Sequence, residues 1–478
     1  MKSRHLLTTV IVAAGVLAVS SPAMATNGYF THGVGTQSKG MAGAGVGSNS
    51  DMGAIMSASN PALGAFVSDK WEIGLSVFSP RRSYSAGPSQ LNGGFIDLGG
   101  CSPTNPELCL PSHTITQGTI DSSSEYFPIP YVAKNWSLAN DGNITFAFYG
   151  RGGMNTDWDD SNASATGYLC GPPNSDGSPP TGQGPYCAGV AGVNLSQAFL
   201  ALNYSAKVGD NFAFGIGPVL AFQMFEAKGV SPTFVPITQT FAASGGTELP
   251  SSLSDNGDDT SFGYGLALGL WWGITDRVSV GLAYQSEMEM DEFDKYSDLF
   301  AESGGFNIPS SLKFGLSVLA TEALRINFDI DHTTYSDIKS IANPMVNMTG
   351  CPTLPLGGTD LESCLGGNNG AGFGWEDMTT YKLGFEWASD ERNIWRFGYS
   401  YGEQPIQSAD VLFNILAPGV MEQHVTFGYT RMRENGGAWN FSFMYAPENT
   451  VSGPSFFDPT QTIDLKMSQL EFEVSFRF

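Results

Sequence analysis

Basic residues are scarce in this chain of 478 residues. Lysine and arginine together number 22, against 46 aspartate and glutamate residues, so the formal net charge at pH 7 is −24. A nucleic acid is therefore not an expected partner, because binding to a phosphate backbone requires clustered positive charge. Histidine is also rare, with five residues, and no set of serine, histidine and aspartate can be assembled from the pattern. We expect no enzyme, no cofactor and no metal centre.

Long hydrophobic runs are absent after residue 25. Residues 1–25 carry Lys2 and Arg4 ahead of an apolar run and end in Ala23-Met24-Ala25, which predicts a cleaved secretory signal peptide. The remaining 453 residues contain no stretch of about 20 apolar residues, the length that a membrane-spanning helix needs. Any crossing of a membrane must therefore be made by β-strands.

Fourteen short segments of alternating apolar and polar residues make up most of the remaining chain. The segments are 71–84, 126–136, 143–156, 191–207, 211–226, 261–273, 277–290, 310–320, 324–335, 379–388, 394–401, 421–431, 437–446 and 467–478. Six connections are very short, and seven are long, namely 85–125, 157–190, 227–260, 291–309, 336–378, 402–420 and 447–466. This pattern predicts an all-β fold, a transmembrane antiparallel up-and-down barrel of fourteen strands with both termini on the short-turn side.

The alternation within a segment predicts which face meets lipid. In the last segment the apolar face holds Leu470, Phe472, Val474, Phe476 and Phe478, and the polar face holds Glu471, Glu473, Ser475 and Arg477. Charged side chains cannot face hydrocarbon, so the polar face lines a lumen. A soluble β-sandwich also alternates, but it does not require this switching between short and long connections.

Cysteine is rare as well, with six residues in three couples that are local in sequence. The couples are Cys101 with Cys109, Cys170 with Cys187, and Cys351 with Cys364. Each couple falls within one long loop, which predicts three loop-stapling disulfides in an oxidising compartment. Zinc binding is the alternative, but no couple has CxxC spacing or a nearby pair of histidines.

The chain thus divides into a signal peptide (1–25), a glycine-rich leader (26–66) and a barrel with long extracellular loops (67–478). The leader has neither a helical nor a strand period, is too rich in small residues to form a core, and is too apolar to be a solvated tail. Beside a wide barrel, such a segment is expected to be a plug.

The leader closely resembles the OmpP1/FadL/TodX family of outer-membrane transporters for long-chain fatty acids and hydrocarbons. The resemblance rests on Gly33-Val34-Gly35-Thr36-Gln37-Ser38, on Met41-Ala42-Gly43-Ala44 and on Asn60-Pro61-Ala62. It continues at Gly153-Met154-Asn155-Thr156-Asp157-Trp158, Ile308-Pro309-Ser310 and Trp395-Arg396-Phe397-Gly398-Tyr399. It implies a monomeric bacterial outer-membrane barrel closed by an N-terminal hatch that includes Asn60, Pro61 and Ala62.

The resemblance also implies a transport route. Outer loops would capture a hydrophobic small molecule, a pocket above the hatch would bind it, and a gap in the wall near a kinked third strand would release it sideways. The expected partners are this molecule and the lipid and lipopolysaccharide of the outer membrane. Because Gly150, Gly152 and Gly153 favour a bulge or kink in the third strand, we place the lateral opening there. The alternative is that these glycines relieve crowding against the hatch.

Two long loops carry candidates for the outer capture site. Phe293, Tyr296 and Phe300 recur at positions i, i+3 and i+7 within 291–309, which predicts a short amphipathic helix. Its apolar stripe could form a groove with Phe234, Val235 and Ile237 of the preceding long loop. Simple packing between the loops is the alternative for each residue.

A fatty-acid carboxylate in a buried site would be bound by arginine or lysine. Strand phase places four basic candidates toward the lumen, namely Lys313, Arg325, Lys382 and Arg396. Salt bridges to acidic residues on the same faces are the alternative for each of them. The chain lacks a basic residue around Gln223 and just before the tenth strand at Trp375-Glu376-Asp377, where fatty-acid members of the family carry one, and this favours a neutral hydrocarbon or aromatic ligand.

Two alternative functions stay open. A general porin would share the barrel but should lack a plug-like leader. A surface adhesin or receptor would use the long stapled loops, and such a role could coexist with transport.

Overall fold

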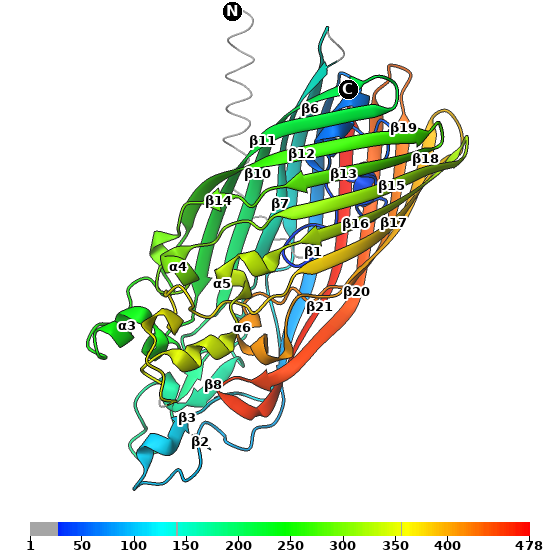
Figure 1. The fold of residues 1–478 in the computed structure, drawn as a ribbon. Coiled ribbons are helices and arrows are strands. Elements are labelled where there is room, and N and C mark those ends of the chain that lie inside the picture. The colour runs from blue at the N-terminus through cyan, green and yellow to red at the C-terminus, as the bar shows by residue number, and fades with distance from the viewer. Residues whose placement is uncertain (1–26, 140–141, 355) are drawn as a thin grey trace, which may run out of the picture.

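Fourteen antiparallel strands close into a barrel in the computed structural model, which describes residues 27–139, 142–354 and 356–478 (Figure 1). Neighbours in sequence are neighbours in the wall, and the pairing of β11 with β12 closes the ring. The predicted fold class is confirmed. The barrel strands are β1 (Trp71–Ala86), β6 (Phe127–Ser137), β7 (Gly142–Asn155), β10 (Gly192–Val208), β11 (Phe212–Lys228), β12 (Asp259–Thr275), β13 (Val278–Gln285), β15 (Ser311–Thr321), β16 (Leu324–Thr333), β17 (Met378–Ala388), β18 (Asn393–Gly402), β19 (Gln423–Met432), β20 (Ala438–Ser455) and β21 (Asp458–Arg477).

The two faces of the wall have the predicted character. On β21 the side chain of Phe472 is 50% exposed, whereas its neighbour Glu473 is 1% exposed. The same contrast holds on β18, where Phe397 is exposed and Arg396 is buried. Aromatic and aliphatic side chains therefore face outward, and charged side chains face a filled interior.

Short helices and small strands occupy the N-terminal segment and the outer loops. Among the described residues, no helix is long or apolar enough to cross a membrane. The small strands are β2 (Phe95–Asp97), β3 (Cys109–Pro111), β4 (His113–Ile115), β5 (Gly118–Asp121), β8 (Ser164–Gly167), β9 (Thr181–Gln183) and β14 (Glu289–Met290). The helices are α2 (Thr36–Lys39), η2 (Ala54–Ala58), η3 (Pro61–Phe66), η4 (Pro106–Leu108), η5 (Tyr168–Cys170), η6 (Val235–Ile237), α3 (Gln239–Ala243), η7 (Asp294–Tyr296), α4 (Ala301–Gly304), η8 (Tyr335–Asp337), α5 (Lys339–Ala342), η9 (Met345–Gly350), η10 (Leu361–Ser363), η11 (Ser408–Asp410) and α6 (Val411–Asn414).

The last outer connection differs from the prediction. We expected a long loop over 447–466, but β20 and β21 continue as a paired ribbon until a tight turn at Phe456 and Phe457. The ladder shifts register between Ala446 and Asn449, so Pro447, which lacks an N–H, is accommodated in a bulge. The prediction of a long loop there is wrong.

A small outer subdomain sits on the long-loop end of the barrel. It contains the hairpin of β2 with β3 and the sheet of β4, β8 and β9. The three predicted disulfides are confirmed, with Cα separations of 4.8 Å for Cys101–Cys109, 5.3 Å for Cys170–Cys187 and 4.8 Å for Cys351–Cys364. They staple the loops that contain them.

Acid is expected to loosen this subdomain at His113. Burial lowers the pKa of His113, which contacts the carbonyl oxygen of Pro185 at 2.7 Å, to about 4. The unfolded chain takes up a proton near pH 6.5 and the folded chain does not, so stability that is present above pH 6.5 is lost as the pH falls toward 4. The loss amounts to about 3 kcal/mol. Hydrogen exchange of the β4 amides at pH 7 and 4.5, corrected for intrinsic rates, measures it.

His113→Gln is the matched variant for that measurement, because glutamine keeps a donor but cannot be protonated in this range. Its β4 amides should show the same stability at both pH values. An equal acid-induced loss in the variant and in the wild type would contradict the assignment to His113.

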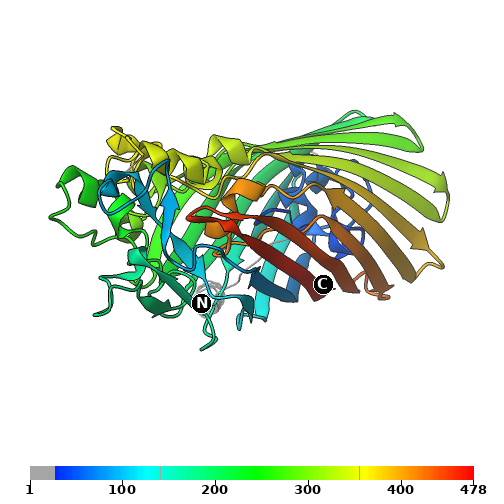
Figure 2. The same cartoon turned by 90° about the horizontal axis from the view of Figure 1, so that it is seen from below.

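The N-terminal segment, defined as residues 27–66, lies inside the barrel (Figure 1, dark blue). Viewed from below, it is enclosed between the green strands and the orange strands (Figure 2). The wall accommodates this backbone with glycines: a side chain at Gly281 would meet the carbonyl of Val46, and one at Gly398 would meet the backbone of Met41. The segment thus fills the lumen. The predicted signal peptide lies outside the described residues.

Candidate ligand pathway through the barrel

The barrel wall is incomplete between β6 and β7. The ladder joining these strands ends at the pair Tyr131 and Tyr149, while β7 continues for six more residues, to Asn155. Pro128 and Pro130 stand in the part of β6 that has no pairing to β7, and proline cannot donate to a ladder. The outer half of the β6 and β7 junction therefore lacks strand pairing.

The three glycines of β7 lie at this gap, as the sequence predicted. On the other side of β7, the ladder to β10 pairs Gly152 with Gln197 and Gly150 with Ala198, which leaves Arg151 as the extra residue of a β-bulge. The predicted bulge is confirmed. Whether the gap serves as a lateral opening stays a prediction.

The N-terminal segment occupies the unpaired edge of β7. The amide of Thr31 donates to the carbonyl of Arg151 at 2.8 Å, and the amide of Gly153 donates to the carbonyl of Tyr29 at 3.0 Å. Phe30, between them, forms an isolated β-bridge with Gly152. Residues 29–31 thus replace the missing partner of β7 and cover the gap from inside.

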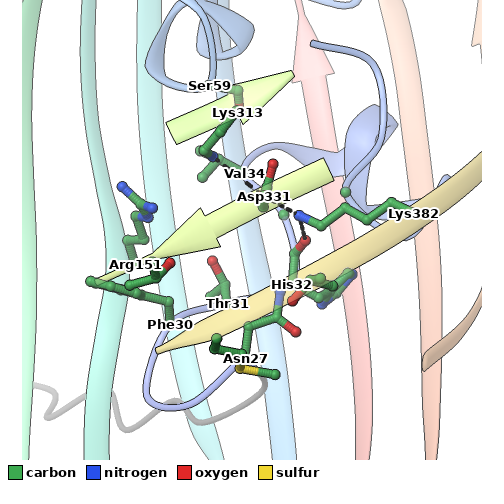
Figure 3. Close-up of a pocket in the computed structure, with 15 residues that line it drawn as sticks. Asn27, Phe30, Thr31, His32, Val34, Ser59, Arg151, Lys313, Asp331 and Lys382 are labelled. Atoms are coloured by element: carbon green, nitrogen blue, oxygen red, sulfur yellow. Dashed lines mark hydrogen bonds and ion pairs between the residues drawn. The ribbon is translucent and has the colours of Figure 1, made fainter. Parts of the chain in front are cut away.

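A small cavity lies beside this contact and is lined by cationic side chains (Figure 3). The lining includes Arg151 of β7, Lys313 of β15, Lys382 of β17 and one carboxylate, Asp331 of β16. Lys382 lies 2.6 Å from Asp331 and Lys313 lies 3.7 Å from it, so two ammonium groups share one carboxylate. With a volume of about 20 Å³, the cavity has room for water but not for a fatty acid.

The N-terminal segment forms much of the rest of the cavity, mainly through Asn27 and residues 30–34. The ammonium group of Lys382 donates to the carbonyl of His32 at 3.0 Å. Burial, reinforced by the ammonium groups of Lys39 and Lys382, lowers the pKa of His32 well below its usual value. Neutral His32 therefore leaves the positive charge of the cavity unchanged.

The four basic candidates divide into two pairs. Lys313 and Lys382 line the cavity. Arg396 instead bonds to Glu386 at 2.8 Å and to Thr430 at 2.6 Å, and Arg325 donates to Ser317 at 3.0 Å. The sequence analysis missed Arg151 as a candidate, although its place among three glycines was a usable signal.

Asn60, Pro61 and Ala62 anchor the N-terminal segment on β11 and β12. The carboxamide of Asn60 donates to the carbonyls of Val46 and Leu270 at 3.0 and 3.1 Å, and its oxygen accepts the amide of Ala62 at 3.0 Å. The proline at the first position fixes the start of η3. This motif holds the C-terminal end of the segment, far in sequence from the contact with β7.

Buried ion pairs hold the middle of the segment. Lys39 is 4% exposed, and its ammonium group lies 2.5 Å from Glu471 and 2.6 Å from Glu473 of β21. Although burial opposes the charged form, these two carboxylates raise the pKa of Lys39 above its ordinary value. The segment is therefore attached to the wall by charge as well as by backbone.

A family model described as outer membrane protein transport protein (OMPP1/FadL/TodX) matches residues 183–430. This match spans more than half of the chain. The chain belongs to this family. OMPP1/FadL/TodX proteins are transport proteins of the outer membrane and not enzymes, so the chain is an outer-membrane β-barrel.

Solved structures of similar proteins share this barrel. The Pseudomonas putida toluene transporter TodX is 15% identical, with a TM-score of 0.59 over 94% of this chain and 98% of that one. A Pseudomonas aeruginosa FadL homologue is 14% identical, with a TM-score of 0.59 over 94% and 99%. The Ralstonia pickettii toluene transporter TbuX is 14% identical, with a TM-score of 0.54 over 94% and 98%. No curated protein sequence matches the chain.

In this OMPP1/FadL/TodX protein, the predicted capture residues share one hydrophobic cluster but have two different sets of aromatic partners. Phe293, Tyr296 and Phe300 surround Phe225 of β11, with ring centroids 5.5, 4.9 and 4.7 Å away. Phe234 contacts Tyr186, Phe413 and Phe457 instead. Ile237 is buried and Val235 is half-buried. Ligand contact at these residues stays a prediction.

The prediction of a short amphipathic helix within 291–309 is wrong. The segment forms η7, a 3-10 turn, followed by the four residues of α4, in which Glu302 and Ser303 have positive φ angles of 59° and 57°. Residues with φ above zero cannot continue a right-handed helix. The rings recur at a helix-like spacing because they converge on one partner, Phe225.

Proposed function

We propose that this protein carries hydrophobic compounds from the outer surface of the cell into the outer membrane, and that the N-terminal segment is its hatch. The observation that carries the proposal is the gap between β6 and β7, which the Tyr29 to Thr31 backbone covers and which adjoins a cationic cavity. Family membership and the toluene transporters among similar structures support it.

Lateral release suits an apolar cargo. Passage through water to the far side of the membrane would cost about 25 cal/mol for each Å² of apolar surface, whereas a gap in the wall leads directly into hydrocarbon. The cargo would enter between the outer loops, reach the cavity when the hatch withdraws, and leave beside the bulge at Arg151. Since the closed barrel leaves no free sheet edge, we propose that a monomer suffices, surrounded by lipid and lipopolysaccharide.

A long-chain carboxylate is the cargo whose charged headgroup best matches the cavity. Three cationic side chains and one carboxylate line it, so it carries positive charge that an anionic headgroup would neutralise. A neutral or aromatic hydrocarbon is the alternative. A general porin for polar solutes fits less well, because residues 27–66 fill the lumen.

Cells that lack their own transporter provide the test. Expression of the full chain should allow uptake of labelled palmitate or labelled toluene above the level of cells with an empty vector. Uptake of neither compound, with the barrel folded in the outer membrane, would contradict the proposed function.

Lys313→Met is expected to separate the two cargo classes. Lys313 lines the cavity, and its ammonium group lies 3.7 Å from Asp331, whereas that of Lys382 lies 2.6 Å away, so Lys313 is the more available of the two lysines. Loss of a charged hydrogen bond costs about 1.5–3 kcal/mol, and we therefore expect palmitate uptake to fall roughly tenfold or more while toluene uptake stays unchanged. Lys466→Met, at a half-buried lysine of β21 that does not line the cavity, is the control. Equal palmitate uptake in both variants would exclude a role for Lys313.

A further inference from the structure

Arg82 is a buried arginine without a hydrogen-bond acceptor. It lies on the inward face of β1 with 4% of its surface exposed, and neither terminal nitrogen of its guanidinium has an acceptor among the described residues. The adjacent Arg81 points outward and pairs with Glu125 and Tyr126. The two neighbours thus differ in environment although they are the same residue type.

The Arg82 side chain borders a second, mostly apolar cavity. Its other lining residues come from β7 and from two outer loops, and they are Met154, Asn155, Trp375, Ala417, Pro418 and Gly419. The ring of Phe127 lies 5.9 Å from the guanidinium carbon. The carboxamide oxygen of Asn155 also lacks a donor, but it is neutral and cannot offset the charge of Arg82. The guanidinium therefore faces a site that supplies no anion.

This cavity lies at the outer rim of the wall gap. Phe127 is the first residue of β6. Beyond the end of β6, the amide of Ser122 in the outer loop donates to the carbonyl of Arg82 on β1. Met154 and Asn155 belong to the part of β7 that has no β6 partner. Trp375 has its ring 6.1 Å from that of Tyr29 in the N-terminal segment. A ligand here would touch both the gap and the hatch.

A buried cation is costly unless an anion compensates it. Guanidinium presents a planar pair of donors that matches a carboxylate, and the apolar lining matches a hydrocarbon chain. We propose that Arg82 binds the carboxylate of an amphiphilic acid at the outer rim of the gap, a binding site separate from Lys313 and Lys382. The cavity has a volume of only about 10 Å³ in this structure. A hydrocarbon chain can enter it only if the lining turn at 417–419 moves aside. This inference rests on the proposed function.

Binding to the purified full chain in detergent tests the inference. Measured in the Lys313→Met background, where the cationic cavity does not mask the effect, Arg82→Gln should weaken binding of labelled palmitate roughly tenfold to a hundredfold, as expected for loss of a charged hydrogen bond, and leave binding of hexadecanol unchanged. Arg82→Lys should retain part of the palmitate affinity. Arg81→Gln is the matched control and should bind both compounds as Lys313→Met alone does. An unchanged palmitate affinity in Arg82→Gln, or an equal loss for both compounds, would overturn the proposal.

A second measurement locates the ligand without removing the arginine. The described cysteines are all disulfide-bonded, so Met154→Cys places a single free thiol among them, on the cavity beside Arg82. Palmitate should slow maleimide labelling of this thiol, and adding Arg82→Gln should abolish that protection. Labelling that palmitate does not slow would overturn the site. Failure of the wild type to import palmitate or toluene into cells would instead contradict the proposed function.

Discussion

Lys39→Met is expected to open the lumen. The substitution leaves Glu471 and Glu473 as two buried carboxylates without the ammonium group that lies 2.5 and 2.6 Å from them. Breaking a buried ion pair in this way costs about 3–5 kcal/mol. The substitution destabilises the closed state, in which the N-terminal segment fills the barrel. The open state is destabilised less, because withdrawal of the segment lets water solvate both carboxylates.

Single-channel recordings in planar bilayers measure this effect. The wild type should stay closed to ions, because the segment fills the barrel, and Lys39→Met should show frequent openings. Lys466→Met is the control, since Lys466 lies on the same strand, β21, but is only half-buried. Adding Glu471→Gln and Glu473→Gln should restore much of the closure by removing the uncompensated charge. If Lys39→Met opened no more often than the wild type, the ion pair would not be what holds the N-terminal segment in the closed state.

The alternation of apolar and polar residues, together with the switching between short and long connections, was enough to predict the barrel. A strand has a side-chain period of two, and lipid on one side with a charged lumen on the other makes that period visible in sequence. The disulfides were predictable for a different reason, because each cysteine couple falls within one loop and needs no knowledge of the tertiary fold.

Local signals failed where the backbone leaves its regular path. We expected a loop from residue 447 onward, yet a bulge accommodates Pro447 and the hairpin continues to Ser455. The rings of Phe293 and Phe300 indicated a helix, yet the turn η7 covers only 294–296 and Phe300 itself has an extended backbone with φ −84° and ψ 144°. Both errors arise because long-range packing and pairing decided the local conformation.

The strand period predicted on which side of the wall a basic residue lies, but not its position along the barrel axis. Arg396 and Lys382 both point inward, as predicted, but Arg396 pairs with Glu386 while Lys382 lines the cavity. Arg151 was missed because it is the extra residue of a bulge, where the alternation of side chains between the two faces is interrupted. Depth along the barrel depends on register between strands, which a single sequence does not contain.

Locking the N-terminal segment to β7 is expected to abolish transport. Phe30 and Gly152 face each other in an antiparallel bridge, and such pairs have Cα atoms about 4.5–5.5 Å apart, within the range that a disulfide spans. Phe30→Cys with Gly152→Cys should therefore cross-link spontaneously in an oxidising compartment. A side chain at Gly152 would meet the amide oxygen of Gln197, the end of a flexible side chain, so each single cysteine variant is a required control.

Palmitate and toluene uptake by the oxidised double variant, before and after mild reduction, is the measurement that tests the account most directly. The account predicts background uptake in the oxidised state, recovery on reduction, and wild-type behaviour of both single variants under the same reductant. Full uptake by the cross-linked protein would contradict the account, because the cargo would then cross the membrane without the hatch leaving the gap between β6 and β7.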